Sequence, residues 1–256
     1  MINIAIEAAK AAGQVIEKGF NQTHSITYKD SRNIVSETDV AAEKSILEIL
    51  KRSFPEHNFF SEEAGQTQNQ SEYLWIIDPL DGTTNFIHGF PHVGISIALL
   101  KNKQPILGVI LDPLHNELFT AETGQGAYLN GIKISPSTTD SLEKTVTIMT
   151  RGATTESIKR HADLYQTIIT NTHSTRITGS VALGLAYLAC GRFDASINND
   201  CKFYDCVAGN LISHEAGAIL TTFRNQPWKG DSQGSTDILA ANKHMHNQIL
   251  NLIKEK

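Results

Sequence analysis

The segment Tyr73–Asn85, with the sequence Tyr-Leu-Trp-Ile-Ile-Asp-Pro-Leu-Asp-Gly-Thr-Thr-Asn, constrains the fold of this chain more than any other. Its first five residues, 73–77, are apolar and predict a short buried β-strand. Pro79 disfavours helical backbone at the residue before it, so we expect the strand to end at Asp78 with a carboxylate at its tip. Residues 82–84, Gly-Thr-Thr, then predict a tight turn that opens a helix.

Two carboxylates accompany this turn, Asp78 and, three residues later, Asp81. A turn that opens a helix presents free backbone N–H groups, and these suit a phosphate. Two hard carboxylates beside such a turn indicate oxygen-ligated Mg²⁺ that holds a phosphoryl group. The alternative is an ordinary strand–turn–helix corner in which Asp81 is a helix N-cap. The segment alone leaves both interpretations open.

Composition places the chain among ordinary globular proteins. Its 256 residues suffice for one large domain or two closely packed ones, and 40% of them are hydrophobic. Twenty-two Lys and Arg against 27 Asp and Glu give a formal charge of −5, so we expect neither nucleic acid nor an anionic membrane as a partner. A protein that handles phosphorylated substrates can still be acidic when metal ions supply the local positive charge.

Several features indicate a cytoplasmic protein. The three cysteines, Cys190, Cys201 and Cys206, are too few for a disulfide framework and fit a reducing compartment. The N-terminus is amphipathic with an early acid, unlike a signal peptide. Apolar runs stay far below membrane-spanning length.

The first half of the chain predicts two helices followed by strands. Apolar spacing favours helices over about 3–20 and 40–53, and Thr38 or Asp39 stands where the second helix would be capped. Taken alone, Asp39 is therefore a helix cap. Residues 93–135 predict an antiparallel meander that ends in an Asn130–Gly131 hairpin.

The second half predicts alternating elements and hence a covered sheet. A Ser-, Thr- and Pro-rich seam at 135–141 separates it from the first half. We expect strands near 145–149, 176–178, 194–197, 219–222 and 238–241, and helices near 155–169, 180–190, 204–216 and 243–254.

Four stretches in the same order resemble the inositol monophosphatase family of metal-dependent, lithium-sensitive phosphatases. They are Asn33–Asp39, Ser61–Glu63, Trp75–Pro91 and Tyr204–Gly217, and the resemblance covers about residues 3–255. It implies a mixed α+β or α/β fold, a layered αβαβα sandwich of the inositol monophosphatase and fructose-1,6-bisphosphatase type. It also implies a homodimer.

The resemblance implies one catalytic unit over residues 1–256. The α+β half, about 1–140, would contain the metal motif. The α/β half, about 141–256, would supply Asp205 and the substrate wall.

The resemblance also implies two or three Mg²⁺ ions per site. By analogy, Glu62, Asp78 and the backbone carbonyl of Leu80 ligate one ion. Asp78, Asp81 and Asp205 ligate a second, and Glu63 assists a third, weaker ion through water. Such all-oxygen ligation is what Mg²⁺ prefers, and a metal pair can stabilise both the attacking and the leaving oxygen of a phosphoryl transfer.

Catalytic and substrate roles follow from the same resemblance. Asp39 and Thr83 would orient and deprotonate a metal-activated water, and the backbone N–H groups of Gly82 and Thr83 would hold the phosphate. Residues that would line the site for the alcohol moiety are Gly179, Ser180, Val181 and Asn198.

Two residues depart from the family's pattern on this substrate wall. Asn198 aligns with a glutamate that binds an inositol hydroxyl, and an amide loses the charge-assisted bond. Tyr204 replaces the tryptophan usual before the last ligand.

We therefore expect a Mg²⁺-dependent phosphoric monoester hydrolase that acts on a small phosphorylated substrate, first of all inositol monophosphate. Histidinol phosphate and fructose 1,6-bisphosphate are the alternatives. An adenosine 3′,5′-bisphosphate phosphatase is disfavoured, because those relatives usually carry lysine where Thr84 stands. A non-catalytic regulator that binds a phosphorylated ligand is the alternative of another class. The presence of every metal-ligating acid favours the enzyme.

Overall fold

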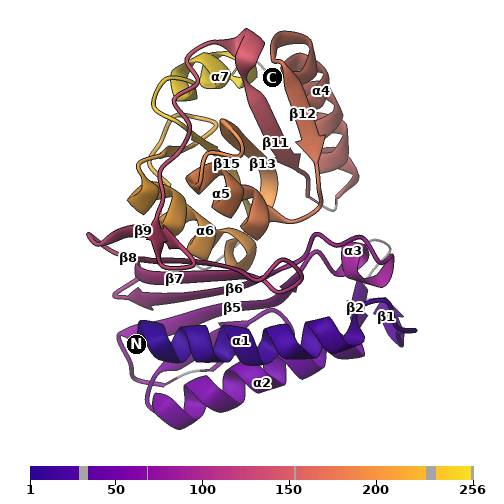
Figure 1. Ribbon diagram of the computed structural model, residues 1–256, viewed down its shortest axis with the longest axis vertical. Helices are drawn as coiled ribbons and strands as arrows, with labels where there is room; N and C mark the ends of the chain where they lie inside the picture. The colour runs from indigo at the N-terminus through magenta and orange to yellow at the C-terminus, as the bar shows by residue number, and fades with distance from the viewer. Residues whose placement is uncertain (29–33, 68, 153, 229–234, 255–256) are drawn as a thin grey trace.

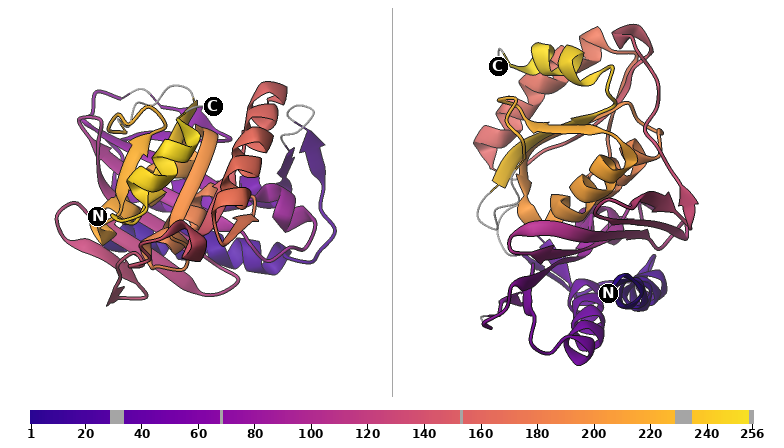
Figure 2. Two further views of the ribbon diagram at one scale, coloured as in Figure 1. Left: turned by 90° about the horizontal axis from the view of Figure 1, so that it is seen from above. Right: turned by 90° about the vertical axis from the view of Figure 1, so that its left-hand side faces the viewer.

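The computed structural model describes residues 1–28, 34–67, 69–152, 154–228 and 235–254. Its elements form layers: two helices, a large sheet, two helices, a smaller sheet and two more helices (Figure 1). The right-hand view of Figure 2 shows these layers edge-on, with the N-terminal helices at one end and the C-terminal helix at the other. The αβαβα order expected from the sequence is confirmed.

The first layer consists of α1 (Ile2–Gly19) and α2 (Glu37–Ser53), which lie side by side on one face of the large sheet (Figure 1). Four buried alanines of α1 at helical spacing let the helix approach its neighbours closely. They are Ala5, Ala8, Ala9 and Ala12. Larger buried side chains of α2 and of the sheet, such as Ile46 and Trp75, complete this core.

The large sheet has eight strands in the order β10-β9-β8-β7-β6-β5-β3-β4. It is antiparallel apart from the β3–β5 pair. The strands are β3 (Asn58–Ser61), β4 (Gly65–Gln66), β5 (Tyr73–Asp81), β6 (Gly94–Lys101), β7 (Gln104–Asp112), β8 (Glu117–Glu122), β9 (Gly126–Leu129) and β10 (Ile132–Lys133). The predicted meander and its Asn130–Gly131 hairpin are confirmed, and both hairpin residues have the positive φ that such a turn requires.

The middle layer, α5 (Val181–Ala189) and α6 (Phe203–Ala216), lies between the two sheets. Both helices contribute to one hydrophobic cluster against the large sheet and to another against the smaller sheet. A helix packed on two opposite faces is apolar all round, which explains why α6 shows little periodicity in its sequence.

The smaller sheet has five strands in the order β12-β11-β13-β15-β14. They are β11 (Val146–Thr150), β12 (Ser174–Ile177), β13 (Ala195–Lys202), β14 (Ile219–Thr222) and β15 (Ser235–Ala241). The helices α4 (Thr155–Asn171) and α7 (His246–Ile253) cover its outer face through a third cluster that includes Leu164 and Ile249. The covered sheet expected in the second half is confirmed.

Four short elements of the described residues remain. α3 (Thr83–Ile87) follows β5 directly, as the Gly-Thr-Thr turn predicts. β1 (Ile26–Tyr28) pairs with β2 (Ile34–Ser36), and a 3₁₀ turn spans Leu142–Lys144. The sequence did not indicate β2, β4 or the 3₁₀ turn.

Strand β5 does not end at Asp78, so that expectation is wrong. It continues to Asp81, with a shift of register against β6 between the two carboxylates. A proline has no N–H for the ladder, and an irregularity of this kind is where a strand tolerates one. The shift keeps Asp78 and Asp81 on the same strand.

Helix α2 begins one turn earlier than expected, and neither Thr38 nor Asp39 is its N-cap. Ser36 is the N-cap, and Asp39 is the third residue of a capping box. Asn33, at the start of the stretch that resembles the family, lies outside the described residues.

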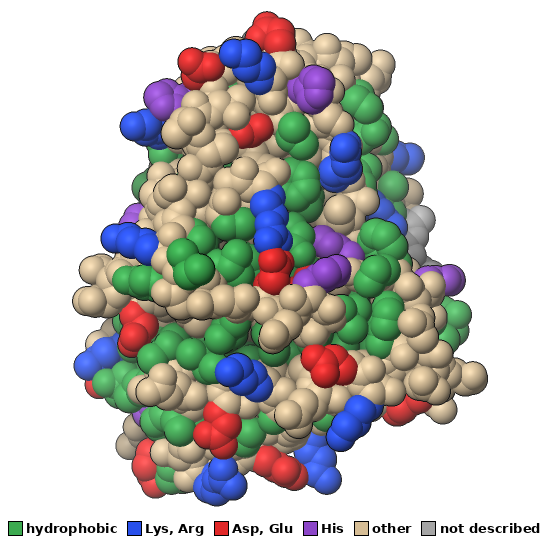
Figure 3. All heavy atoms as spheres, viewed as in Figure 1, with side chains coloured by type: hydrophobic (Ala, Val, Ile, Leu, Met, Phe, Trp, Pro, Cys, Tyr) green, Lys and Arg blue, Asp and Glu red, His purple; other side chains and the backbone are tan. Residues whose placement is uncertain are grey.

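Basic and acidic side chains alternate on the described face shown in Figure 3 rather than forming a patch of one sign. None of the described helices combines the length and the apolar character that crossing a bilayer requires. All three cysteines are free thiols.

Candidate active site

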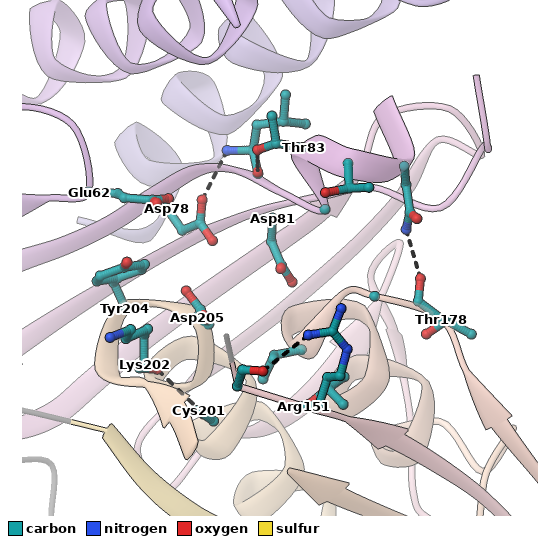
Figure 4. A pocket seen from close by; sticks show the side chains of 18 of the residues that line it. Glu62, Asp78, Asp81, Thr83, Arg151, Thr178, Cys201, Lys202, Tyr204 and Asp205 are labelled. Atoms are coloured by element: carbon teal, nitrogen blue, oxygen red, sulfur yellow. Dashed lines mark hydrogen bonds between the residues drawn. The ribbon is translucent and has the colours of Figure 1, made fainter. Parts of the chain in front are cut away.

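A cavity of about 660 Å³ lies where the two halves of the chain meet. From the first half come the end of β5, the start of α3 and Glu62; the second half supplies the ends of β11 and β13, the segment before α5 and the start of α6 (Figure 4). Among the predicted site residues that line it are Glu62, Asp78, Leu80, Asp81, Gly82, Thr83, Gly179, Val181 and Asp205. Residues from both halves of the sequence thus meet in one cavity.

Five acidic side chains belong to this lining: Glu62, Asp78, Asp81, Asp200 and Asp205. Two of them are nearly inaccessible, since Asp78 is 2% exposed and Asp81 8%. Burial, and then the neighbouring carboxylates, raise the pKa of Asp78 well above its ordinary value. Burial raises the pKa of Asp81 to about 7, and burial together with Asp81 raises the pKa of Asp205. Buried acids that destabilise one another's charged form suit a divalent cation.

The carboxylates do not form a closed ligand cage. Among the described residues, no three His, Cys, Asp or Glu side chains are arranged to hold a metal ion as they stand. Mg²⁺ takes much of its shell from water and backbone carbonyls, so a donor set of this chemistry still fits it. The ligand assignments therefore stay predictions.

Asp39 and Thr83, far apart in sequence, are hydrogen-bonded in the structure. The Thr83 hydroxyl donates to Asp39 Oδ1 at 2.7 Å, and Asp39 is 2% exposed. The other carboxylate oxygen, Oδ2, accepts bonds from the backbone N–H and hydroxyl of Ser36. Asp39 thus takes part in the helix cap through Oδ2 and contacts Thr83 through Oδ1, so both interpretations of this residue hold. The cap fixes the orientation of the carboxylate that Thr83 contacts. Burial raises the pKa of Asp39, partly offset by these hydrogen bonds.

Ser180 does not line the cavity; it holds Asp81. Its hydroxyl donates to Asp81 Oδ2 at 2.6 Å, and the N–H of Ala182 donates to the same oxygen at 2.7 Å. Ser180 is fully buried and also caps α5 by accepting from the N–H of Leu183. The expectation that Ser180 contacts the alcohol moiety is replaced by a positioning role, since its hydroxyl is occupied on both sides.

Replacing Ser180 with alanine is expected to lower kcat/KM about tenfold, because Asp81 loses a hydrogen bond to a charged group. Loss of the cap should also lower the free energy of unfolding by about 1 kcal/mol. Thr154→Ala is the matched control, since Thr154 caps α4 by accepting from the N–H of Ser157 at 3.0 Å. It should lose similar stability and keep its activity. Full activity in Ser180→Ala would contradict the positioning role.

The sequence analysis did not identify two residues that hold segments of the site in position. Glu43, one turn after Asp39 on α2, accepts bonds from the N–H groups of Glu63 and Ala64 at 3.0 Å and from the Ser61 hydroxyl. It thereby orders the loop that contains Glu62. An acid on the buried stripe of α2, four residues after Asp39, was the available signal.

Asn85 is the second such residue. Its side-chain amide donates to the carbonyls of His92 at 2.8 Å and Thr178 at 2.7 Å. It thus ties the segment before α5 to the helix that follows β5 (Figure 4). No local signal identifies it, because both acceptors are backbone groups.

Gly82, the N-cap of α3, satisfies two geometric demands. Its φ is +99°, and a Cβ there would lie 3.0 Å from the carbonyl oxygen of His92. A residue with a side chain would be strained in backbone and crowded in space. Glycine therefore permits the close turn whose N–H groups are predicted to hold phosphate.

The predicted substrate wall differs from the observed one at Asn198. Asn198 is fully buried behind it: its Oδ1 accepts from Thr150 Oγ1 at 2.6 Å and its Nδ2 donates to Ser196 Oγ. The side chains that reach the cavity from this direction belong to Arg151, Asp200 and Lys202. The irregularity in β13 after Asn198 and the positive φ of Asp200, +56°, turn Asp200 toward the cavity, which residue spacing could not indicate.

Known structures first define the class of fold. Over 99% of this chain, the structure superposes on 98% of the chain in "Crystal structure of extragenic suppressor protein suhB from Bartonella henselae, native", with a TM-score of 0.93 and 30% identity. The class is the layered α+β fold of the inositol monophosphatases.

Sequence comparison then gives the family. The model of the "Inositol monophosphatase family" matches residues 1–256, so the chain belongs to that family. It is 38% identical to "Inositol monophosphatase 2" of Solanum lycopersicum over 99% of this chain and 98% of that protein. It is 40% identical to "Nus factor SuhB" of Xylella fastidiosa over 87% of this chain and 82% of that protein. Membership supports phosphatase activity.

Proposed function

We propose that the chain hydrolyses a small phosphomonoester in a Mg²⁺-dependent reaction, and that residues 1–256 work as one catalytic unit. The observation that carries the proposal is the Asp39–Thr83 hydrogen bond at the edge of a cavity that is also lined by the four acids proposed to bind metal directly. Inositol monophosphate is the substrate proposed first, because relatives bear the name inositol monophosphatase.

Mg²⁺, when bound, neutralises phosphoryl oxygens and lowers the pKa of water. The groups proposed to hold it are the side chains of Glu62, Asp78, Asp81 and Asp205, the carbonyl of Leu80 and, through water, Glu63. Asp81 is held by α5 and Asp205 lies in the first turn of α6, so both middle helices support the ligand set. The metal therefore needs both halves of the chain.

The Asp39–Thr83 pair is proposed to handle the proton. Thr83 has a single hydroxyl hydrogen, for which Asp39 Oδ1 at 2.7 Å is the nearer acceptor and the carbonyl oxygen of Leu80 at 3.1 Å the second. The lone pairs of the hydroxyl oxygen are therefore left to accept from other donors. A water that donates to Thr83 is thereby oriented toward the phosphate. As the water gives its proton to the Thr83 oxygen, Asp39 accepts the hydroxyl proton of Thr83. This role suits a carboxylate whose pKa is raised by burial.

Phosphate binding is proposed at the backbone N–H groups of Gly82 and Thr83. The N-terminal end of α6 also borders the cavity, and its partial positive charge favours a phosphate there. These groups are held by the fold before substrate arrives, which is the condition for electrostatic stabilisation of a transition state.

Phosphate release from inositol 1-phosphate, histidinol phosphate, fructose 1,6-bisphosphate and adenosine 3′,5′-bisphosphate tests the proposal. We expect turnover with Mg²⁺ and none after chelation, with kcat/KM ranking the substrates. Adenosine 3′,5′-bisphosphate should rank last. Metal-independent turnover would contradict the proposed chemistry.

A regulator that binds a phosphorylated ligand without hydrolysing it is the second candidate. Relatives named Nus factor SuhB favour it, since that name does not describe a phosphatase. Saturable Mg²⁺ binding without turnover of any ester would support this candidate. For both functions we propose that the protein is cytoplasmic and forms a homodimer. Sedimentation equilibrium would test the dimer by measuring the mass of the particle in solution.

A further inference from the structure

The wall of the cavity opposite Asp78 and Thr83 carries two cations, and we infer that it is a second anion subsite. The structure assigns Arg151 and Lys202 to bind a phosphate or carboxylate on the alcohol part of the substrate. The site then also takes phosphomonoesters that carry a second anionic group, and it prefers each of them to its counterpart without that group. This inference rests on the proposed function, and it names the substrate class.

Both cations lie at the carboxyl ends of neighbouring strands in the smaller sheet. Arg151 directly follows β11, and Lys202 is the last residue of β13. β11 and β13 are parallel neighbours, so their carboxyl ends open on the same side, and both residues line the cavity. Figure 4 shows the guanidinium group of Arg151 projecting into the cavity from the wall that faces Asp78 and Thr83.

Within the described part of the chain, neither cation forms an ion pair. Arg151 donates from Nη1 to the carbonyl of Gly152 at 3.2 Å, which leaves most of its five N–H donors for a ligand. A guanidinium group binds carboxylate and phosphate with two parallel hydrogen bonds. Arg151 is therefore the stronger anion-binding residue of the two.

One acid shares this wall, and it is already engaged. The carboxylate of Asp200 accepts a bond from the hydroxyl of Ser235, and it packs so closely on Gly152 that a Cβ there would overlap the carboxylate. Lys202 also faces Asp205, whose pKa it lowers in opposition to burial. Asp200 and Asp205 offset the charges of the two cations, so the subsite depends on the remaining N–H donors of Arg151 rather than on a net positive charge.

The cavity separates the two anion positions. Gly82, Thr83 and the metal-ligating acids define the position of the phosphate that is hydrolysed, while Arg151 contacts the far end of whatever is attached to it. A volume of about 660 Å³ accommodates a small sugar or acid with two charged groups. The competing explanation is that Arg151 only balances the charge of the acids, which predicts no preference among substrates.

Two matched pairs of esters test the inference with the full-length protein in Mg²⁺. Fructose 1,6-bisphosphate is compared with fructose 1-phosphate, and 2-phosphoglycerate with glycerol 2-phosphate. We expect the member with the second anionic group to have about ten- to a hundredfold higher kcat/KM in at least one pair. The first pair reports a phosphate-binding subsite and the second a carboxylate-binding one.

Arg151→Gln is expected to reduce that ratio about tenfold or more, and Lys202→Met to reduce it less. Arg176→Gln removes the same charge from a residue outside the cavity lining and should keep the ratio. A ratio near one in the wild type, or a ratio unchanged in Arg151→Gln, would overturn the inference while leaving phosphatase activity intact.

Binding measured by calorimetry with Ca²⁺ in place of Mg²⁺ keeps the two proposals separate. If no ester is hydrolysed, the proposed function fails, but the affinity ratio of fructose 1,6-bisphosphate to fructose 1-phosphate still reports the subsite. An affinity ratio that falls in Arg151→Gln supports the inference, and equal affinities in the wild type refute it. Circular dichroism melting confirms that each variant is folded.

Discussion

Replacing Asp78 with asparagine is expected to lower kcat/KM for Mg²⁺-dependent phosphate release by about a thousandfold, or about 4 kcal/mol of transition-state stabilisation. Asp78 is the one side chain proposed to contact both metal ions. The amide keeps the shape of the carboxylate and the hydrogen bond that Oδ1 accepts from the N–H of Leu80 at 3.1 Å. The loss is therefore one of charge rather than of fold.

Asp163→Asn is the matched control, because Asp163 lies exposed on α4 away from the cavity. It should retain wild-type kinetics. Calorimetric titration with Mg²⁺ separates lost metal affinity from lost chemistry. Near-wild-type turnover by Asp78→Asn would refute the ligand assignment at the centre of the proposed mechanism.

Stability of the metal-free protein is expected to fall as the pH rises from about 4 to about 7. An acid whose pKa is higher in the folded than in the unfolded state binds more protons when folded, so the free energy of unfolding decreases with pH between the two values. For Asp81 the pKa is 3.8 in its ordinary state and about 7 in the folded protein, which corresponds to about 4 kcal/mol at most. Asp78 and Asp205 act in the same direction, since their pKa values are also raised.

Urea unfolding in chelator at pH 5.5 and pH 8 measures this effect. Mg²⁺ should restore stability chiefly at pH 8, by about 2.7 kcal/mol at a concentration a hundredfold above its Kd. Asp78→Asn should weaken the pH dependence, because it removes one buried charge and its repulsion of the others, whereas Asp163→Asn should not change it. A metal-free protein that gains stability from pH 5.5 to pH 8 would show that these acids are not mutually destabilising.

Local sequence predicted most elements of the fold, because each depends on spacing that neighbouring residues supply. The Asn130–Gly131 hairpin is one example, since a two-residue turn requires positive φ and these residues tolerate it. The strand ends were less predictable. Whether β5 stops at Asp78 or continues depends on its pairing with β6, and a proline inside the strand conceals that continuation.

In the site, too, some residues could be predicted from local sequence and others depend on contacts with distant segments. The residues of the Tyr73–Asn85 segment were identifiable because carboxylates, glycine and threonine at that spacing have few joint uses. The roles of Glu43 and, within that segment, Asn85 were not identifiable, since each acts by holding backbone groups of distant segments. The family resemblance placed Asn198 on the substrate wall, but this residue pairs with both β11 and β15 in the smaller sheet and is fully buried.

By itself the sequence determined the kinds of chemistry available: acids for a divalent cation, a turn for phosphate and a threonine beside an acid. Only the tertiary structure decided which atoms do what. It gave one oxygen of Asp39 to the helix cap and the other to Thr83, assigned Ser180 to Asp81, and turned Arg151 toward the cavity. The physical reason is that composition and spacing constrain local backbone and charge, whereas hydrogen-bond partners and burial depend on segments that meet only when the layers pack.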